Sequence, residues 1–234
     1  FLATTAWRGL VTGRFVLIGL SSVLMLLTLG MVFLWVPTDK VLGISQKIFY
    51  VHVPVALVGF LAFGVVVIGS VGYLWKKSER MDALAYASAE IGVLFTSLML
   101  ITGMLWAKPV WGVWWTWSPQ LTTSLILWFI YTAYLMLRAY SPQGGQGARY
   151  AAVVGIIGFL DVPVVYMAAK WWRDVHPQAV VGPLADEGTL EGAMVVTFLV
   201  GLLSFTVLFS CLLLERYSLR RQEFIIERLR YTHD

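Results

Sequence analysis

Long apolar runs alternate with short polar segments along almost the whole chain. Six runs of roughly 20 residues or more lie at about 14–36, 50–75, 82–106, 119–139, 149–169 and 190–214. A helix of about 20 apolar residues crosses the roughly 30 Å hydrocarbon core of a bilayer. The pattern therefore predicts an all-α, polytopic membrane protein with six transmembrane helices, in a single integral membrane domain over residues 1–234.

The composition excludes an ordinary soluble domain. Hydrophobic residues make up 59% of the chain and charged residues 13%, with a mean hydropathy of +0.78. Soluble domains contain about 45–50% apolar and about 25% charged residues. The first apolar run is longer than a signal-peptide core and ends at Trp35-Val36-Pro37 without a small-residue cleavage site, so we expect it to be retained as a helix.

Basic residues are divided unevenly between the two sides of the predicted helices. Twelve fall on the side of both termini: Arg8, Arg14, Lys76, Lys77, Arg80, Arg138, Arg149, Arg216, Arg220, Arg221, Arg228 and Arg230. Five fall on the opposite side: Lys40, Lys47, Lys108, Lys170 and Arg173. By the positive-inside rule both termini are predicted to be cytoplasmic, and segments 37–49, 107–118 and 170–189 to face outward. The net charge of +4 then matches anionic lipid headgroups, and we expect no nucleic-acid partner.

The basic tail, residues 215–234, is predicted to be cytoplasmic. Apolar side chains such as Leu219 and Phe224 are interspersed among its arginines. This pattern favours a helix lying on the inner membrane surface, with a docking helix for a cytoplasmic partner as the alternative.

Four tryptophans fall within seven residues, WGVWWTW, in the second outward segment. If this stretch is helical, Trp111, Trp114, Trp115 and Trp117 share one face, with Gly112 opposite. Ser118 and Pro119 would then be the N-cap and first residue of the next helix. An interfacial aromatic belt and a platform for a flat ligand are both open, and the density of indoles favours the platform.

Two of the three histidines lie at the predicted outer face. His52 opens the second apolar run and His176 follows the fifth, whereas His233 is in the tail. Zinc or copper would need further ligands, but two imidazoles suffice for iron when a macrocycle supplies the other four donors. The sequence therefore suggests a haem with two axial histidines, although a lone histidine at such a boundary is more often structural.

Other chemistry is limited by what the sequence lacks. Cys211 is the only cysteine and no C-x-x-C occurs, which excludes a thiol oxidoreductase and a covalent c-type haem site. No phosphate-binding loop occurs either, so any nucleotide hydrolysis belongs to another subunit. Glu90 and Asp161 lie inside apolar runs and are either functional or protonated acids bonded to a neighbouring helix, and Asp161 could bond backbone freed by Pro163.

Three motifs between residues 46 and 178 resemble the heme exporter protein C (CcmC) family of cytochrome c maturation, within the superfamily of haem-handling proteins with a Trp-rich motif. They are Ile48-Phe49-Tyr50-Val51-His52-Val53-Pro54, the run from Trp111 to Trp117 followed by Leu121-Thr122-Thr123-Ser124, and Lys170-Trp171-Trp172-Arg173-Asp174-Val175-His176-Pro177.

The resemblance implies a protein of the bacterial inner membrane, with its functional face periplasmic or extracellular and no catalytic turnover of its own. It implies non-covalent haem b with His52 and His176 as axial ligands, held by Trp111, Gly112, Trp114, Trp115 and Trp117. The expected partners are a periplasmic haem chaperone, the membrane and ATPase subunits of an ABC transporter, a small single-span subunit and membrane lipid.

The chain departs from the family pattern after the tryptophans. The family usually has an aspartate and an arginine where this chain has Ser118 and Gln120. Lys47, Lys108 and Arg173 are outer cations that could serve haem propionates instead, or be solvated. Two alternatives are a b-type cytochrome, which predicts histidines within the apolar runs, and a transporter subunit without haem.

Overall fold

A computed structural model describes residues 2–141, 145–172, 176 and 190–231 of the chain. Its helices confirm the predicted all-α class. Six segments are long and apolar enough to cross a membrane: Gly13–Trp35, Ile44–Lys76, Glu79–Trp111, Pro119–Tyr140, Gly145–Trp171 and Gly192–Ile226. The predicted spans correspond to these one for one, and the last extends well beyond its predicted end.

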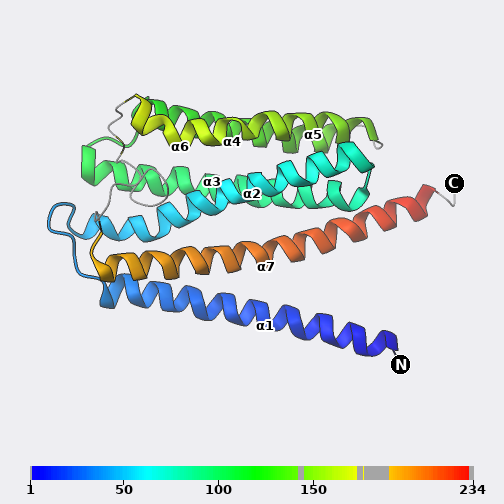
Figure 1. The fold of residues 1–234 in the computed structure, drawn as a ribbon, viewed down its shortest axis with the longest axis horizontal. Helices are drawn as coiled ribbons and strands as arrows, with labels where there is room; N and C mark the ends of the chain where they lie inside the picture. The colour runs from blue at the N-terminus through cyan, green and yellow to red at the C-terminus, as the bar shows by residue number, and fades with distance from the viewer. Residues whose placement is uncertain (1, 142–144, 173–175, 177–189, 232–234) are drawn as a thin grey trace.

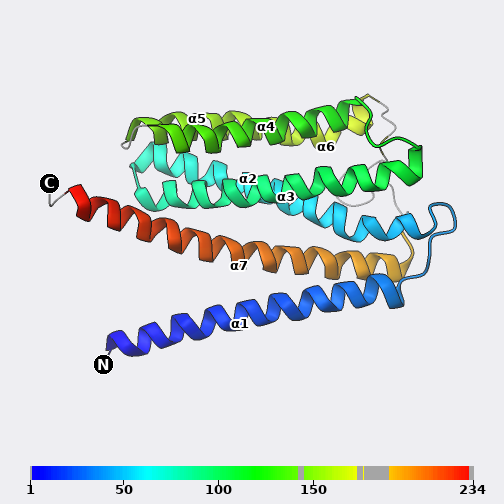
Figure 2. The same ribbon diagram turned by 180° about the vertical axis from the view of Figure 1, so that it is seen from behind.

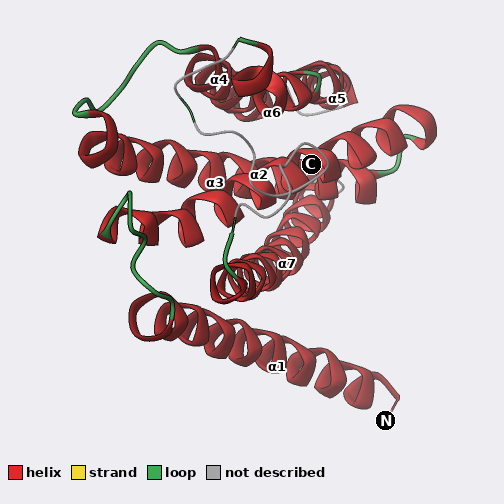
Figure 3. Cartoon of the chain, turned by 60° about the vertical axis from the view of Figure 1, so that its left-hand side comes forward, coloured by secondary structure: helices red, strands yellow, loops and turns green. Residues whose placement is uncertain are grey.

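The helices form three side-by-side groups (Figures 1 and 2). In chain order they are α1 (Leu2–Gly30), the π-helix η1 (Met31–Trp35), the 3-10 helix η2 (Ile44–Ile48), α2 (Phe49–Lys76), α3 (Glu79–Trp111), α4 (Pro119–Tyr140), α5 (Gly145–Phe159), α6 (Asp161–Trp171) and α7 (Gly192–Tyr231). The central pair is α2 and α3. One flank holds α4, α5 and α6, and the other holds α7 with α1 outside it, at the edge of the bundle (Figure 3).

The two ends of the bundle differ in what they carry. Both termini and the turn from α2 to α3 lie at one end, here named the terminus end (Figure 1). The segments from η1 to α2 and from α3 to α4, and the start of α7, lie at the other, here named the loop end. The helices thus separate the predicted inner and outer segments, while the assignment of each end to a membrane face rests on the charge distribution.

Close packing of α2 against α3 fixes these two helices relative to each other. Gly69 allows the approach, because a Cβ there would lie 2.8 Å from the Met81 carbonyl oxygen and 2.9 Å from the Ala85 backbone nitrogen. Towards α4, the Phe63 ring stacks on Tyr131 with 3.6 Å between ring centroids and 7° between planes. This framework sets the positions of the side chains at the loop end of both helices.

The basic tail is not a separate helix. It continues α7 without a break to Tyr231 (Figure 1). Its position at the inner membrane surface stays a prediction. Arg216 of this extension binds Glu90 of α3 through two hydrogen bonds of 2.5 and 2.8 Å. The Arg220 guanidinium lies 4.3 Å from the Tyr86 ring centroid. Glu90 therefore forms an ion pair that joins α3 to α7.

A buried ion pair joins α3 to α4 near the terminus end. Arg138 donates to Asp82 at 2.8 Å, and the two side chains are only 7% and 9% exposed. Removing one partner of such a pair leaves a buried charge and costs about 3–5 kcal/mol. We expect Asp82→Ala to lower the thermal unfolding temperature in detergent clearly, measured by intrinsic fluorescence.

The double variant Asp82→Leu with Arg138→Met serves as the control, because it removes both charges. We expect it to recover most of the loss. Asp82→Ala unfolding at the wild-type temperature would show that the pair does not hold α3 to α4.

Candidate functional site

The Trp-rich segment is a loop that follows the end of α3. Gly112 adopts a φ of +77°, which residues other than glycine rarely tolerate, and its N–H bonds the Lys108 carbonyl at 3.0 Å. The chain is then non-helical until Pro119, with Ser118 in the predicted N-cap position but without a capping bond from its side chain. The helical arrangement of the tryptophans is therefore wrong, because Gly112 ends the helix just after Trp111.

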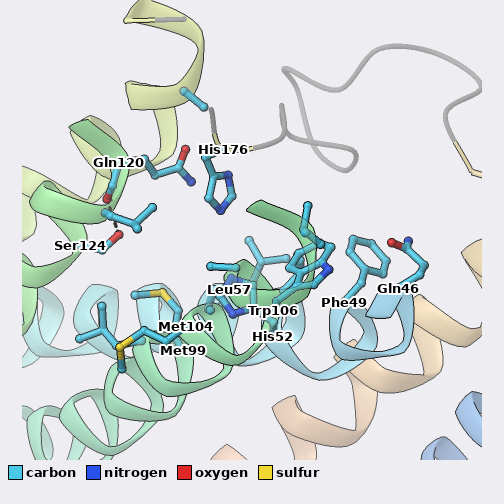
Figure 4. A pocket seen from close by; sticks show the side chains of 18 of the residues that line it. Gln46, Phe49, His52, Leu57, Met99, Met104, Trp106, Gln120, Ser124 and His176 are labelled. Atoms are coloured by element: carbon cyan, nitrogen blue, oxygen red, sulfur yellow. Dashed lines mark hydrogen bonds between the residues drawn. The ribbon is translucent and has the colours of Figure 1, made fainter. Parts of the chain in front are cut away.

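A cavity of about 480 Å³ lies at the loop end beside this segment. Its walls come mainly from α2, α3, α4 and α6, with contributions from η2 and the start of α7. Apolar side chains dominate, among them Phe49, Leu57, Met99 and Met104 (Figure 4). A mostly apolar cavity of this size with a few convergent polar groups is the usual form of a cofactor site.

His52 stands in the first turn of α2 and lines this cavity. Its side chain is nearly buried, and its Nδ1 lies 3.0 Å from Thr102 Oγ1 of α3. The Trp106 ring meets the imidazole edge to face, with 5.9 Å between centroids. The histidine is thus fixed between two side chains of α3.

His176 lines the same cavity from the segment that follows α6. Its imidazole meets the Trp111 ring at the end of α3, with 6.3 Å between centroids and 61° between planes. Figure 4 shows His176 and His52 on opposite walls, both facing the cavity. Two histidines 124 positions apart in the chain are therefore brought to one space.

The tryptophans divide into two groups. Trp111 and Trp115 are on the cavity wall. Trp114 and Trp117 lie off the wall and are 54% and 75% exposed, although Trp117 still contacts Trp115 edge to face at 5.8 Å. The structure adds Trp106, which lines the cavity and contacts His52. The sequence could have indicated Trp106 by its position near the end of the third apolar run, five residues before the Trp-rich segment.

Indole N–H groups at the cavity are unsatisfied. Trp106 Nε1 and Trp115 Nε1 are both buried without a hydrogen-bond partner. Buried donors normally have partners, so these two are suited to an acceptor that a ligand would bring.

The lysines considered for propionates are held by backbone carbonyls. Lys108 Nζ donates to the Gly112 carbonyl at 2.9 Å and lies 5.9 Å from the Trp114 ring centroid. Lys47 Nζ donates to the Phe33 carbonyl at 3.3 Å. Arg173 lies outside the described residues.

The two positions that depart from the family pattern have different surroundings. Gln120 lines the cavity, and Figure 4 shows its amide beside the His176 imidazole. Ser118 lies off the cavity wall, and its hydroxyl is buried without a hydrogen-bond partner. Gln120 is therefore the one of the two that could contact a ligand.

The acids within the spans lie away from this cavity. Asp161 begins α6, and its Oδ2 is buried without a hydrogen bond, so the predicted bond to backbone freed by Pro163 does not involve that atom. Glu90 binds Arg216 near the terminus end. Among the described residues, no group of three or more His, Cys, Asp and Glu side chains could hold a bare metal ion.

Comparison with known proteins shows the family of the chain. A family model of heme exporter protein C (CcmC) matches residues 3–231. The chain is 34% identical over 194 residues to heme exporter protein C of Bradyrhizobium diazoefficiens, covering 83% of this chain and 72% of that protein. It is 32% identical over 204 residues to that of Haemophilus influenzae, covering 86% and 82%, and 34% identical over 163 residues to that of Escherichia coli K12, covering 68% and 65%. The chain therefore belongs to the heme exporter protein C family of cytochrome c biogenesis.

Proposed function

We propose that the protein binds one haem b non-covalently in the loop-end cavity, with His52 and His176 as the axial ligands of its iron. The observation that carries this proposal is that both histidines line one apolar cavity. Haem needs two donors from the protein, because its four pyrrole nitrogens supply the rest. The donor set and the apolar walls therefore fit a haem better than a bare metal ion.

The other residues of the cavity hold and orient the macrocycle. Trp111 and Trp115 supply large apolar surfaces on the wall. The free indole N–H groups of Trp106 and Trp115 are suited to the acidic side chains of the macrocycle. Gly112 gives the loop its turn, and the exposed rings of Trp114 and Trp117 are available to a docking partner.

In this proposal the protein presents haem at the periplasmic face of the bacterial inner membrane to a haem chaperone. The twelve basic residues on the side of the termini support this orientation, and family membership supports the pathway. The membrane and ATPase subunits of an ABC transporter and a small single-span subunit act with it. Any ATP hydrolysis occurs in that ATPase subunit.

The absorption spectrum of the purified protein tests the proposal. We expect a low-spin, six-coordinate haem spectrum that diminishes when the apo-chaperone is added, as haem leaves the cavity. A low-spin spectrum that the chaperone leaves unchanged would favour the b-type cytochrome. Purification without haem, and failure to bind added haem, would favour a transporter subunit whose histidines are structural.

The orientation gives a separate prediction. In a variant whose buried Cys211 is replaced by alanine, a cysteine at Val113, which is 43% exposed in the Trp-rich segment, should react with an impermeant maleimide added to the periplasmic side. A cysteine at Ser78 or Gly145, both at the terminus end, should not react. A cysteine at Gln178, in the predicted outward segment 170–189, should react as well, and this position lies outside the described residues. Labelling of Val113 only from the cytoplasmic side would reverse the proposed direction of delivery.

A further inference from the structure

Two consecutive residues of α3 contact the His52 imidazole. Thr102 places its Oγ1 3.0 Å from Nδ1. A Cβ at Gly103 would lie 3.1 Å from Cε1 of the same ring. One residue therefore makes a polar contact with the imidazole, and the other leaves the space that the ring occupies.

The direction of the bond between Thr102 and His52 follows from the remaining contacts of the hydroxyl. Thr102 Oγ1 lies 2.7 Å from the Leu98 carbonyl oxygen and 3.2 Å from that of Met99. A carbonyl oxygen only accepts, and a hydroxyl has one proton. If that proton pointed to His52, two oxygens 2.7 Å apart would face each other with no proton between them. The hydroxyl therefore donates to Leu98 and accepts from Nδ1.

The direction of this hydrogen bond determines which nitrogen of the His52 ring is free to bind iron. If Nδ1 carries the proton of a neutral imidazole, Nε2 carries the lone pair. Iron binds the lone-pair nitrogen, and a ligating histidine commonly donates its other N–H to an acceptor that fixes its tautomer and orientation. The Trp106 ring restricts rotation of the imidazole from another side.

We propose that Thr102 and Gly103 are positioning residues that hold His52 in the Nδ1–H tautomer with Nε2 directed to the haem iron. The inference rests on the proposed function and adds to it a side-chain acceptor that raises the basicity of one axial ligand, beside the Met99 carbonyl that also bonds the His52 ring. Donation from Nδ1–H to Thr102 increases electron density on the imidazole and so favours ferric over ferrous iron. The protein thereby influences the oxidation state of the bound haem as well as its position.

The test compares Thr102→Val and Thr102→Ser in the full-length purified protein. Valine keeps the branched shape and removes the acceptor, whereas serine keeps the hydroxyl. We expect Thr102→Val to bind haem roughly 10–100-fold more weakly and to shift the reduction potential of the bound haem to more positive values. Thr102→Ser should have a haem affinity and a reduction potential near the wild-type values.

Thr96 provides a matched control within the same helix. Its hydroxyl makes the same pair of contacts, 2.8 Å to the Gly92 carbonyl and 3.2 Å to that of Val93, and Thr96 does not line the cavity. Thr96→Val should leave the reduction potential unchanged. A purely structural role of Thr102 would affect stability without moving the potential.

Gly103→Ala tests the same positioning without removing the hydroxyl. The added methyl group forces the ring to move by a few tenths of an ångström, so we expect weaker haem binding and a broadened low-spin spectrum. Gly64→Ala is its control, because a Cβ there meets only Phe159 at 3.8 Å.

The outcomes distinguish the positioning role of Thr102 and Gly103 from haem binding itself. A wild-type protein that binds haem with the low-spin signature, while Thr102→Val and Gly103→Ala match it in affinity and potential, overturns the positioning role and leaves the proposed function intact. A wild-type protein that binds no haem overturns both. If Thr102→Val fails to fold, Gly103→Ala still decides whether the position of the His52 ring controls haem binding.

Discussion

Alanine in place of either cavity histidine is expected to abolish the low-spin, six-coordinate spectrum of bound haem. Both imidazoles face the same cavity, and the described residues offer no third histidine there. The loss in haem affinity should exceed the roughly 10–100-fold that removal of an outer-shell partner costs. Absorption titration of His52→Ala and His176→Ala with haem measures both effects.

Added imidazole separates loss of a ligand from loss of the fold. If the cavity of His176→Ala is intact, free imidazole should enter it and restore part of the low-spin spectrum. His233→Ala, which changes the remaining histidine in the chain, should match the wild type. An unchanged low-spin spectrum in either cavity variant would show that the ligand assignment is wrong.

The six spans could be predicted because each is a long apolar run. Burial in lipid requires every backbone polar group to be satisfied within the segment, so a run of this length has only one common conformation. The ends of the spans were predicted less well. The last helix runs to Tyr231, and Arg216 in its extension pairs with Glu90 of α3. These residues lie 126 positions apart, so no local pattern contains the contact.

The candidate site was predictable in part for the same reason. The approximate depth of His52 and His176 follows from their positions relative to the apolar runs, and the structure places both on one cavity. The conformation of the Trp-rich segment does not follow from periodicity, because one glycine with positive φ overrides it. The contribution of Thr102 depends on the packing of α2 against α3, which a single sequence does not reveal.

Trp115 and Trp117 belong to the same sequence motif but have different surroundings in the structure. We therefore expect their replacement to have unequal effects on haem binding. Trp115 lines the cavity with a buried indole nitrogen, whereas Trp117 is 75% exposed and off the wall. Loss of a well-packed tryptophan from a binding surface costs about 2 kcal/mol or more. We therefore expect Trp115→Ala to weaken haem binding roughly thirtyfold, measured by titration of the apoprotein.

Phenylalanine at the same position distinguishes the two contributions of the indole. Trp115→Phe keeps an aromatic face but loses the N–H donor, so its effect should lie between wild type and Trp115→Ala. Trp117→Ala is the matched control and should bind haem nearly as well as the wild type, while transfer to the chaperone becomes slower if its exposed ring contacts that partner. Equal losses in Trp115→Ala and Trp117→Ala would contradict the division, because a ring with three quarters of its surface in the open would then contribute as much as one on the cavity wall.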